Sequence, residues 1–342
     1  MSPIISKPPY DRELVAAQEA QIAAVARFDP ALAEQMRQPY SISLEHLPAI
    51  RPSARERAAV DKAKQDERLV ELGISHSDHA FPGLDGAPDV TVAVFRPREQ
   101  RPDAPAIFWI HGGGMMFGDR FGLEVGLLDW AAEYGMVIAS VEYRLAPENP
   151  FPRPLDDVYA GLTGFLSAHT GFGVDPQRVI LAGGSAGGTL AAGAALRARD
   201  TDGPRLAGQL LICPMLDDRN DTLSSRQFSR FGPWDRESNQ TAWTAFVGFA
   251  AGTDEVSQYA APARATDLSG LPPTFIDVGS AEVFRDEDLA YASAIWAAGG
   301  DAELHVWPGG YHGFHAAVPD AAISRGANRA REEWVRRILD LS

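Results

Sequence analysis

The sequence predicts an α/β fold built on a mostly parallel sheet, and two observations lead to this prediction. From residue 88 onward, short apolar runs alternate with longer segments of helical periodicity. Several of the runs are apolar on both faces, which is typical of strands covered by helices on both sides. The chain has 342 residues and is 45% hydrophobic, so it has enough apolar material for a large core.

The candidate strands are seven apolar runs, at residues 90–95, 106–111, 136–143, 178–183, 208–214, 273–279 and 302–307. Helices are expected between and after them, at residues 122–134, 155–169, 186–199, 286–298 and 320–340. Glycines follow the first and fourth of these helices, and glycine is common just past a helix end. Strands that alternate with helices imply parallel neighbours in a doubly wound sheet.

The first 85 residues read differently from the rest. A helix is expected at residues 11–28, and a second from Ser53, with Glu56 as the partner in a capping box, to Gly73. Both helices carry many charges and little apolar surface, so we expect them to form a lid or flank. The first strand of the sheet is expected in this part of the chain as well.

Residues 217–262 interrupt the alternation of strands and helices. They contain no clear strand, but they hold six large aromatic side chains, Phe228, Phe231, Trp234, Trp243, Phe246 and Phe249. Two interpretations stay open, ordinary core packing and a lid that forms the wall of a pocket. We therefore divide the chain into an N-terminal helical cap segment with the first strand (1–85), an α/β core (86–216 and 263–342) and a cap insertion (217–262).

Charge and cysteine content exclude several classes of function. Lys plus Arg is 31 and Asp plus Glu is 46, so the net charge is 31 − 46 = −15. Such an acidic surface repels phosphate backbones and anionic lipid, so we expect no nucleic-acid and no membrane partner. Cys213 is the single cysteine, which excludes an internal disulfide, a cysteine zinc site and an iron–sulfur cluster.

The N-terminus, MSPIISKPPYDRE, lacks the basic start and apolar run of a signal peptide. No run of about 18 uncharged apolar residues occurs that could span a membrane. These two observations predict a cytoplasmic location.

The strongest chemical signal is the run Gly183 to Gly188, GGSAGG, between a predicted strand and a predicted helix. Gly-x-Ser-x-Gly in this context is typical of a nucleophile elbow, which holds Ser185 in a strained turn and aims the Ala186 N–H at the reaction centre. A passive glycine-rich turn is the alternative. Dinucleotide binding is disfavoured, because a serine stands where the fingerprint needs its second glycine, and no Gly-Lys-Ser/Thr follows for a Walker A loop.

Two further motifs could supply the rest of an acyl-transfer site. His111-Gly112-Gly113-Gly114 ends a predicted strand, and its glycines could present free backbone N–H groups to an oxyanion. His312 follows the last predicted strand and is a candidate base, because the pKa of histidine is near neutrality. A metal site at His312 and the nearby His315 is disfavoured, since no third ligand is evident.

The acid that orients such a histidine is expected between Ser185 and His312, on a loop after a strand. Glu282 lies in the loop after the strand that ends at Gly279. Asp286 lies where a helix is expected to begin, so it could simply complement the helix dipole. The order Ser185, Glu282, His312 is the serine–acid–histidine order of α/β-hydrolases.

Taken together, these motifs resemble the hormone-sensitive-lipase family of α/β-hydrolases, also called bacterial family IV esterases. The resemblance covers roughly residues 85–340 and rests on HGGG (111–114), VEYRLAPENPFP (141–152), GGSAGG (183–188), GSAEVFRDEDLAYA (279–292) and YHGF (311–314). It implies the family's fold, an eight-stranded sheet with a helical cap built from the N-terminus and a mid-chain insertion.

The resemblance also implies a mechanism, hydrolysis of small to medium acyl esters without a cofactor or a metal. In it, Ser185 attacks the ester carbonyl, His312 takes the serine proton and Glu282 orients the imidazolium. The N–H groups that bind the oxyanion would be those of Gly112, Gly113 or Gly114 and of Ala186, and the pocket-lining residues those that follow the oxyanion motif, Met115, Met116 and Phe117.

The chain departs from the family pattern at two positions. The commonest nucleophile motif of the family has Asp where this chain has Gly184, which leaves open what that side chain would contact. The family's usual catalytic Asp aligns with Glu282, whose extra methylene requires a slightly displaced loop.

Two other functions stay open at this point. An amidase or peptidase could use the same three side chains, and some relatives with this fold bind ligands without catalysis. For assembly, the last predicted strand, 302–307, is expected at a sheet edge, and an apolar edge strand tends to be covered or paired. A homodimer through this strand is therefore predicted.

Overall fold

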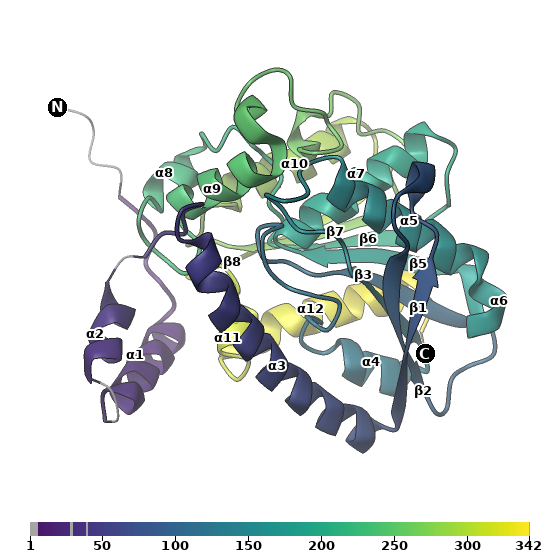
Figure 1. Ribbon diagram of the computed structural model, residues 1–342, viewed down its shortest axis with the longest axis horizontal. Coiled ribbons are helices and arrows are strands. Elements are labelled where there is room, and N and C mark those ends of the chain that lie inside the picture. The colour runs from purple at the N-terminus through teal and green to yellow at the C-terminus, as the bar shows by residue number, and fades with distance from the viewer. Residues whose placement is uncertain (1–5, 28–29, 39, 342) are drawn as a thin grey trace.

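The computed structural model describes residues 6–27, 30–38 and 40–341, and within them the chain forms an eight-stranded sheet (Figure 1). The strand order is β1-β2-β4-β3-β5-β6-β7-β8. The strands are β1 (Ile74–Phe81), β2 (Val90–Pro97), β3 (Ala104–Ile110), β4 (Val137–Val141), β5 (Val174–Gly184), β6 (Gly208–Ile212), β7 (Thr274–Gly279) and β8 (Ala302–Trp307).

The sheet is antiparallel at one end and parallel elsewhere. β1 pairs with β2 and β2 with β4 in antiparallel register, and all pairs from β4 to β8 are parallel. This confirms the predicted fold class, and each of the seven apolar runs overlaps one strand. β8 ends the strand order, so it is an edge strand as predicted.

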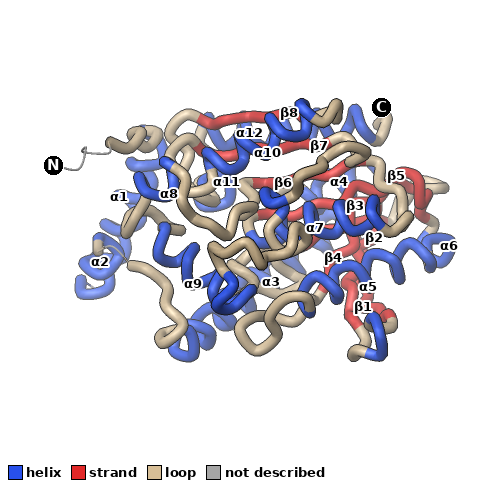
Figure 2. Tube along the Cα trace, turned by 90° about the horizontal axis from the view of Figure 1, so that it is seen from above, coloured by secondary structure: helices blue, strands red, loops and turns tan. Residues whose placement is uncertain are grey.

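Helices cover both faces of the sheet (Figures 1 and 2). One face carries α4 (Leu127–Tyr134) and α12 (Ala322–Ile338), and the other carries α5 (Arg153–Ser167), α7 (Ala186–Asp200) and α10 (Arg285–Ala297). The short helices α6 (His169–Phe172) and α11 (Phe314–Ala317) complete the core. Because β3 to β8 are parallel, their carboxyl ends lie on the same side of the sheet. The predicted motifs follow β3, β5, β7 and β8 on that side.

Two predicted helix starts were wrong. The helix expected from residue 122 begins at Leu127, because Gly126 before it has φ 93°, which is outside the helical region. The helix expected from Ser53 begins at Leu47 and runs through Pro52, so Ser53 lies in its interior and is not an N-cap. Its end at Gly73, with φ 65°, is as predicted.

The N-terminal part contains α1 (Arg12–Ala26), α2 (Pro30–Arg37) and α3 (Leu47–Leu72). The helix predicted at residues 11–28 matches α1, and its predicted last residue, 28, lies outside the described residues. The segment before α3 bonds to the 217–262 insertion, since the Ile42 N–H donates to Ser238 Oγ at 2.8 Å and the Thr241 hydroxyl donates to the Ile42 carbonyl at 2.8 Å. The two stretches expected to form a cap therefore touch each other.

The 217–262 insertion contains two helices, α8 (Leu223–Gln227) and α9 (Arg236–Val247), and a 3₁₀ turn at Gly248–Ala250. A second 3₁₀ turn, Pro262–Arg264, begins at the last residue of the insertion. Its aromatic residues have different surroundings. Phe228, Trp243 and Phe246 are buried and pack in the core, whereas Phe249 is fully exposed. Trp234 is buried beside the loops that follow the parallel strands, as described below. None of the described helices is both long and apolar enough to cross a membrane.

Candidate active site

Ser185 lies in a tight turn between β5 and α7. Its φ of 55° and ψ of −121° are rare for a residue with a side chain, and such strain is found where function requires it. The flanking glycines allow the turn, because a Cβ on Gly183 would lie 2.2 Å from the Gly187 carbonyl oxygen and one on Gly187 would lie 2.1 Å from the Ile110 carbonyl oxygen. The geometry is that of the nucleophile elbow expected from the sequence.

A hydrogen-bonded chain links the serine, histidine and glutamate singled out in the sequence. His312 Nε2 lies 3.0 Å from Ser185 Oγ, and His312 Nδ1 lies 2.6 Å from Glu282 Oε2. The other carboxylate oxygen of Glu282 accepts the N–H of Gly279 at 2.8 Å. Because Glu282 is buried and held at both oxygens, it can orient the imidazole toward the serine.

Asp286, the alternative acid, is engaged elsewhere. Its Oδ2 accepts the N–H of Ser224 at 2.7 Å, and its Oδ1 accepts from Arg285 at 2.7 Å. Asp286 lies in the first turn of α10, where a carboxylate also complements the helix dipole. The structure thus brings Glu282 to His312 and joins Asp286 to the insertion.

The loop from His111 to Gly114 lies against the serine turn. A Cβ on Gly112 would be 2.9 Å from the Gly184 carbonyl oxygen and 3.3 Å from Ser185 Cβ. Gly113 and Gly114 have φ of 106° and 61°, values that residues with side chains rarely adopt. Within the described residues, none of the three glycine N–H groups donates a hydrogen bond, and Ala186 begins α7 directly after the serine.

The segment after β4 supports this glycine loop. The Tyr143 hydroxyl donates to the His111 carbonyl at 2.9 Å, and its ring stacks on the His111 ring at 4.2 Å between centroids. The Ala146 N–H donates to the Met115 carbonyl at 2.8 Å. The Tyr-Arg-Leu-Ala-Pro segment therefore fixes the backbone on both sides of the three glycines, at His111 and at Met115.

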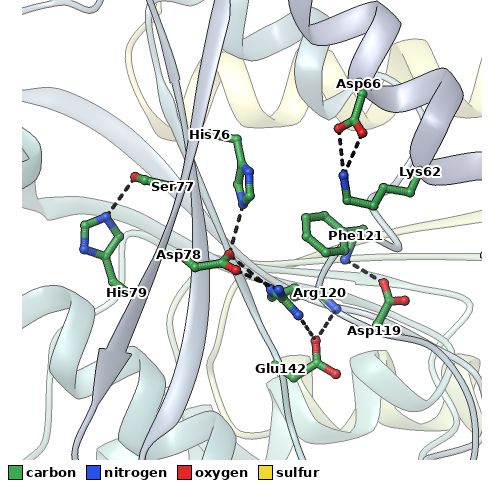
Figure 3. A network of polar contacts seen from close by, with 10 residues as sticks. All are labelled: Lys62, Asp66, His76, Ser77, Asp78, His79, Asp119, Arg120, Phe121 and Glu142. Carbon is green, nitrogen blue, oxygen red and sulfur yellow. Dashed lines mark hydrogen bonds and ion pairs between the residues drawn. The ribbon is translucent and has the colours of Figure 1, made fainter. Parts of the chain in front are cut away.

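Farther along the same loop, Arg120 ties it to the sheet (Figure 3). Its guanidinium donates to Asp78 of β1 at 2.7 Å and to Glu142 after β4 at 2.9 Å. The hydrogen bond from Arg120 holds the pKa of Asp78 below its usual range. The ammonium group of Lys62 on α3 lies 4.7 Å from the ring centroid of the next residue, Phe121. Helix α3 therefore packs against the loop beyond the glycines.

A cavity of about 490 Å³ lies between α3 and the glycine loop. Met116 and Phe117 line it, together with His111, Gly112 and side chains of α3 that include Arg51 and Lys62. Met115 is fully buried and is not among the lining residues. Of the three residues expected to line a pocket, two therefore face this cavity.

Trp234 forms a wall on the other side of the glycine loop. A Cβ on Gly114 would lie 2.6 Å from the Trp234 ring, and the ring centroid is 6.4 Å from that of His312. In the sequence Trp234 is one of six aromatic residues in the insertion, and nothing local separates it from the others. Its place beside the histidine comes from the packing of the insertion on the core.

The structure also brings together residues that the sequence did not connect. Glu124, which follows the glycine loop, accepts from His315 at 2.9 Å and lies 3.4 Å from Arg331 of α12. Burial alone would raise the pKa of the Glu124 carboxyl, but the charges of His315 and Arg331 and the hydrogen bond from His315 lower it to about 2. The pairing was invisible in the sequence because 207 residues separate Glu124 from Arg331.

Among the described residues, one group of side chains has the spacing of a metal site, Cys213 with Glu282 and His312. Their ligand atoms lie within 4.8 Å of one another. However, His312 Nδ1 already bonds to Glu282, and burial raises the pKa of the Cys213 thiol, so that the thiolate needed for metal binding is disfavoured. The arrangement suits nucleophilic chemistry at Ser185 better than metal binding.

Comparisons with known proteins agree with this geometry. A family model described as alpha/beta hydrolase fold matches residues 107–316. Carboxylesterase NlhH of Mycobacterium tuberculosis is 34% identical over 257 residues, which are 72% of this chain and 79% of that protein. A bacterial heroin esterase has a similar structure, with a TM-score of 0.79 at 37% identity, covering 91% of this chain and 98% of the other.

Esterase LipW from Mycobacterium marinum is similar over almost its whole length, with a TM-score of 0.81 at 30% identity and 99% of each chain covered. The family match spans more than half of the chain, and the similarity to NlhH spans more than two thirds of it. The chain therefore belongs to the α/β-hydrolase family, in the hormone-sensitive-lipase branch that its motifs indicate.

Proposed function

We propose that this protein is a serine carboxylesterase that hydrolyses small to medium acyl esters. The observation that carries the proposal is the chain of hydrogen bonds from Glu282 through His312 to Ser185, at 2.6 and 3.0 Å. Similarity to proteins named carboxylesterase and esterase points to the same reaction.

In this reaction, Ser185 Oγ attacks the ester carbonyl carbon while His312 Nε2 takes its proton. Glu282 keeps the imidazole in the required tautomer and stabilises the imidazolium. The carbonyl oxygen, which becomes negative, accepts hydrogen bonds from the N–H groups of Gly112, Gly113 or Gly114 and of Ala186, each worth roughly 3 kcal/mol in the transition state.

The alcohol then leaves with the proton from His312. Water, deprotonated by the same histidine, attacks the acyl-enzyme and releases the acid. No cofactor or metal takes part in these steps.

The preference for small to medium acyl groups is supported by the walls of the site. Trp234 lies against Gly114 and near His312, so it limits the room beside the reacting carbonyl. Met116 and Phe117 line the neighbouring cavity, and the Met115 carbonyl accepts the Ala146 N–H, which fixes the start of this stretch. We propose further that residues 1–85 and 217–262 supply the cap over this site.

A labelling and activity experiment tests the function. The expected result is hydrolysis of p-nitrophenyl esters from acetate onward, with rates that fall for long chains, and labelling of Ser185 by a fluorophosphonate. Ser185→Ala should fold normally, take no label and lose activity by about 10⁴-fold or more. Hydrolysis of anilides but not of esters would indicate an amidase, and neither labelling nor hydrolysis would indicate a ligand-binding protein.

Location and assembly are proposals as well. We propose a cytoplasmic esterase that forms a homodimer through β8, with no nucleic acid and no membrane among its partners. The net charge of −15 supports the last two points, because it disfavours anionic polymers and lipids. Recovery of the protein in the cytosolic fraction of its own cells, with no enrichment on anionic vesicles or DNA, is the expected result.

A further inference from the structure

A buried charge cluster lies beneath the loops that carry the serine, the glutamate and the histidine. It consists of Glu124, Asp277 of β7, His315 of α11 and Arg331 of α12. Asp277, His315 and Arg331 have side chains no more than 4% exposed, and that of Glu124 is 10% exposed. Charged groups at such depth are retained only when they are paired.

The contacts inside the cluster form a row. Arg331 donates through Nε to Asp277 Oδ2 at 2.9 Å, and its Nη1 lies 3.4 Å from Glu124 Oε1. His315 Nε2 lies 2.9 Å from the same glutamate oxygen. Trp307, the last residue of β8, also donates to Asp277 Oδ2, at 3.0 Å. Glu124 is therefore the acceptor that joins His315 to the rest of the cluster.

The cluster reaches each loop of the hydrogen-bonded chain. His315 is three residues after His312, and Asp277 is two residues before Gly279, whose N–H holds Glu282. On the third side, a Cβ built on Gly184 would lie 3.9 Å from Glu124 Oε2. One oxygen of the Glu124 carboxylate thus lies in the space toward which a side chain at Gly184 would point, and the other oxygen bonds to His315 in the loop of His312.

We propose that Glu124 is a positioning residue, whose carboxylate holds the His312 loop in register with the serine turn. This inference rests on the proposed esterase function. Glu124 does not touch the reacting atoms and acts through His315. A shift of about 1 Å between a nucleophile and its base can lower a rate by 10²-fold, which is the size of effect such a residue can control.

Glu124→Gln removes the charge but keeps the size of the side chain. We expect kcat for p-nitrophenyl acetate to fall by roughly 10–100-fold, with KM changed by less than about threefold, because the cluster does not touch the substrate. The rate of labelling by a fluorophosphonate should fall in parallel, since it reports on activation of Ser185. Glu99→Gln, at an exposed turn, is the matched control and should leave both rates unchanged.

Gly184 offers a rescue that a merely structural role would not show. A Cβ there would come no closer than 3.4 Å to any neighbour, so the turn has room for a side chain. In the Glu124→Ala background, Gly184→Asp returns a carboxylate to the same space and should recover most of the lost kcat. Gly184→Asn, of equal size but without charge, should not.

A third pair of variants leaves Glu124 in place, in case its removal prevents folding. In the wild-type background, Gly184→Asp adds a second carboxylate beside Glu124. This carboxylate competes with Glu124 for His315 and Arg331, so kcat should fall more than in Gly184→Asn. Equal effects of the two substitutions in either background would overturn the proposal, as would wild-type kcat in folded Glu124→Gln. Inactivity of the wild-type protein itself would instead reject the proposed function.

Discussion

At the scale of single residues, the acidic loop after β7 shows how closely spaced carboxylates acquire different surroundings. Glu282 turns back to His312 and Gly279, whereas Asp286 turns outward to Ser224 and Arg285. Two residues further, Asp288 is fully buried, and within the described residues neither of its carboxylate oxygens has a hydrogen-bond partner. Three carboxylates within seven residues therefore have different surroundings: Glu282 bonds to the histidine, Asp286 bonds to the insertion, and Asp288 is buried without a described partner.

The assignment of Glu282 can be tested against Asp286. Glu282→Gln should lower kcat by about 10³–10⁴-fold with little loss of stability, because the amide favours the wrong imidazole tautomer. Glu282→Asp should keep part of the activity, since the charge stays but its reach shortens. Asp286→Asn should lower the melting temperature more than the rate. An inactive Asp286→Asn beside a fully active Glu282→Gln would reverse the assignment.

Asp288 should make stability depend on pH. Burial, and next the negative charge of Glu287, raise the pKa of Asp288 well above its ordinary value of 3.8. Above pH 3.8 the folded state therefore binds more protons than the unfolded state, and stability falls as the pH rises toward the folded pKa.

Asp288→Asn removes this effect, so its melting temperature should exceed that of the wild type by a margin that grows from pH 4 to pH 8. Each kcal/mol recovered corresponds to roughly 1–2 °C, because the entropy of unfolding grows with chain length. Asp61→Asn, at an exposed position on α3, is the control and should show no such trend. The prediction would be contradicted if the melting temperatures of Asp288→Asn and the wild type differed by the same amount at pH 4 and at pH 8.

At the scale of elements, α1 packs against the segment that carries His312. Leu14 of α1 is fully buried in a cluster with Tyr311, which directly precedes His312, and Phe314, which lies two residues after it. Tyr10, just before α1, packs edge-on against Tyr311 at 5.7 Å between ring centroids. The N-terminal segment therefore packs against the histidine loop, in addition to its proposed place in the cap.

Leu14→Ala should reduce both stability and rate. The cavity left by a buried leucine costs about 2–5 kcal/mol, and loosening of the histidine loop should lower kcat below the melting transition. Val60→Ala on α3, where the side chain is 56% exposed, is the matched control and should change little. Wild-type kcat in a destabilised Leu14→Ala would show that α1 contributes packing alone.

Deletion of residues 1–40 should leave the sheet folded, since no strand precedes Ile74 in the described residues. We expect a lower melting temperature and a changed preference among p-nitrophenyl esters of different chain length, because these residues flank the histidine loop and continue into the segment bonded to α9. Circular dichroism checks the fold, and kcat/KM across the ester series checks the preference. Kinetics and melting temperature equal to those of the full chain would reject the segment as a cap.

At the scale of the whole molecule, β8 is the sheet edge nearest to the histidine loop. It bonds to β7 on one side and ends the strand order. Val306 on β8 and Trp296 on the neighbouring α10 are apolar side chains that are 39% and 48% exposed. This edge is therefore the candidate surface for the proposed dimer.

Light scattering at micromolar concentration should give twice the mass of one chain. Val306→Lys should shift the mass to that of a monomer, because a lysine on an edge strand opposes pairing. Val70→Lys, at a position on α3 that is 82% exposed, is the control and should stay dimeric. A monomeric wild-type protein would exclude this mode of assembly.

The sequence by itself determined the alternation of strands and helices and the three loops that carry Ser185, Glu282 and His312. These signals are local, because apolar periodicity and glycine-rich turns act within about ten residues of chain. The sequence did not delimit β1, whose residues alternate between exposed and half-buried positions and include His76 and Asp78. Unlike β8 at the other edge of the sheet, β1 lacks the apolar run by which the other strands were found.

Only the tertiary structure decided which residues from distant parts of the chain meet. The wall formed by Trp234, the start of α3 at Leu47 and the pairing of Glu124 with Arg331 all depend on contacts across the fold. The physical reason is that burial and ion pairing depend on distance in space, whereas sequence patterns report only on neighbours along the chain. The sequence therefore indicated the reacting groups, and the fold alone revealed the buried charges that lie beneath them.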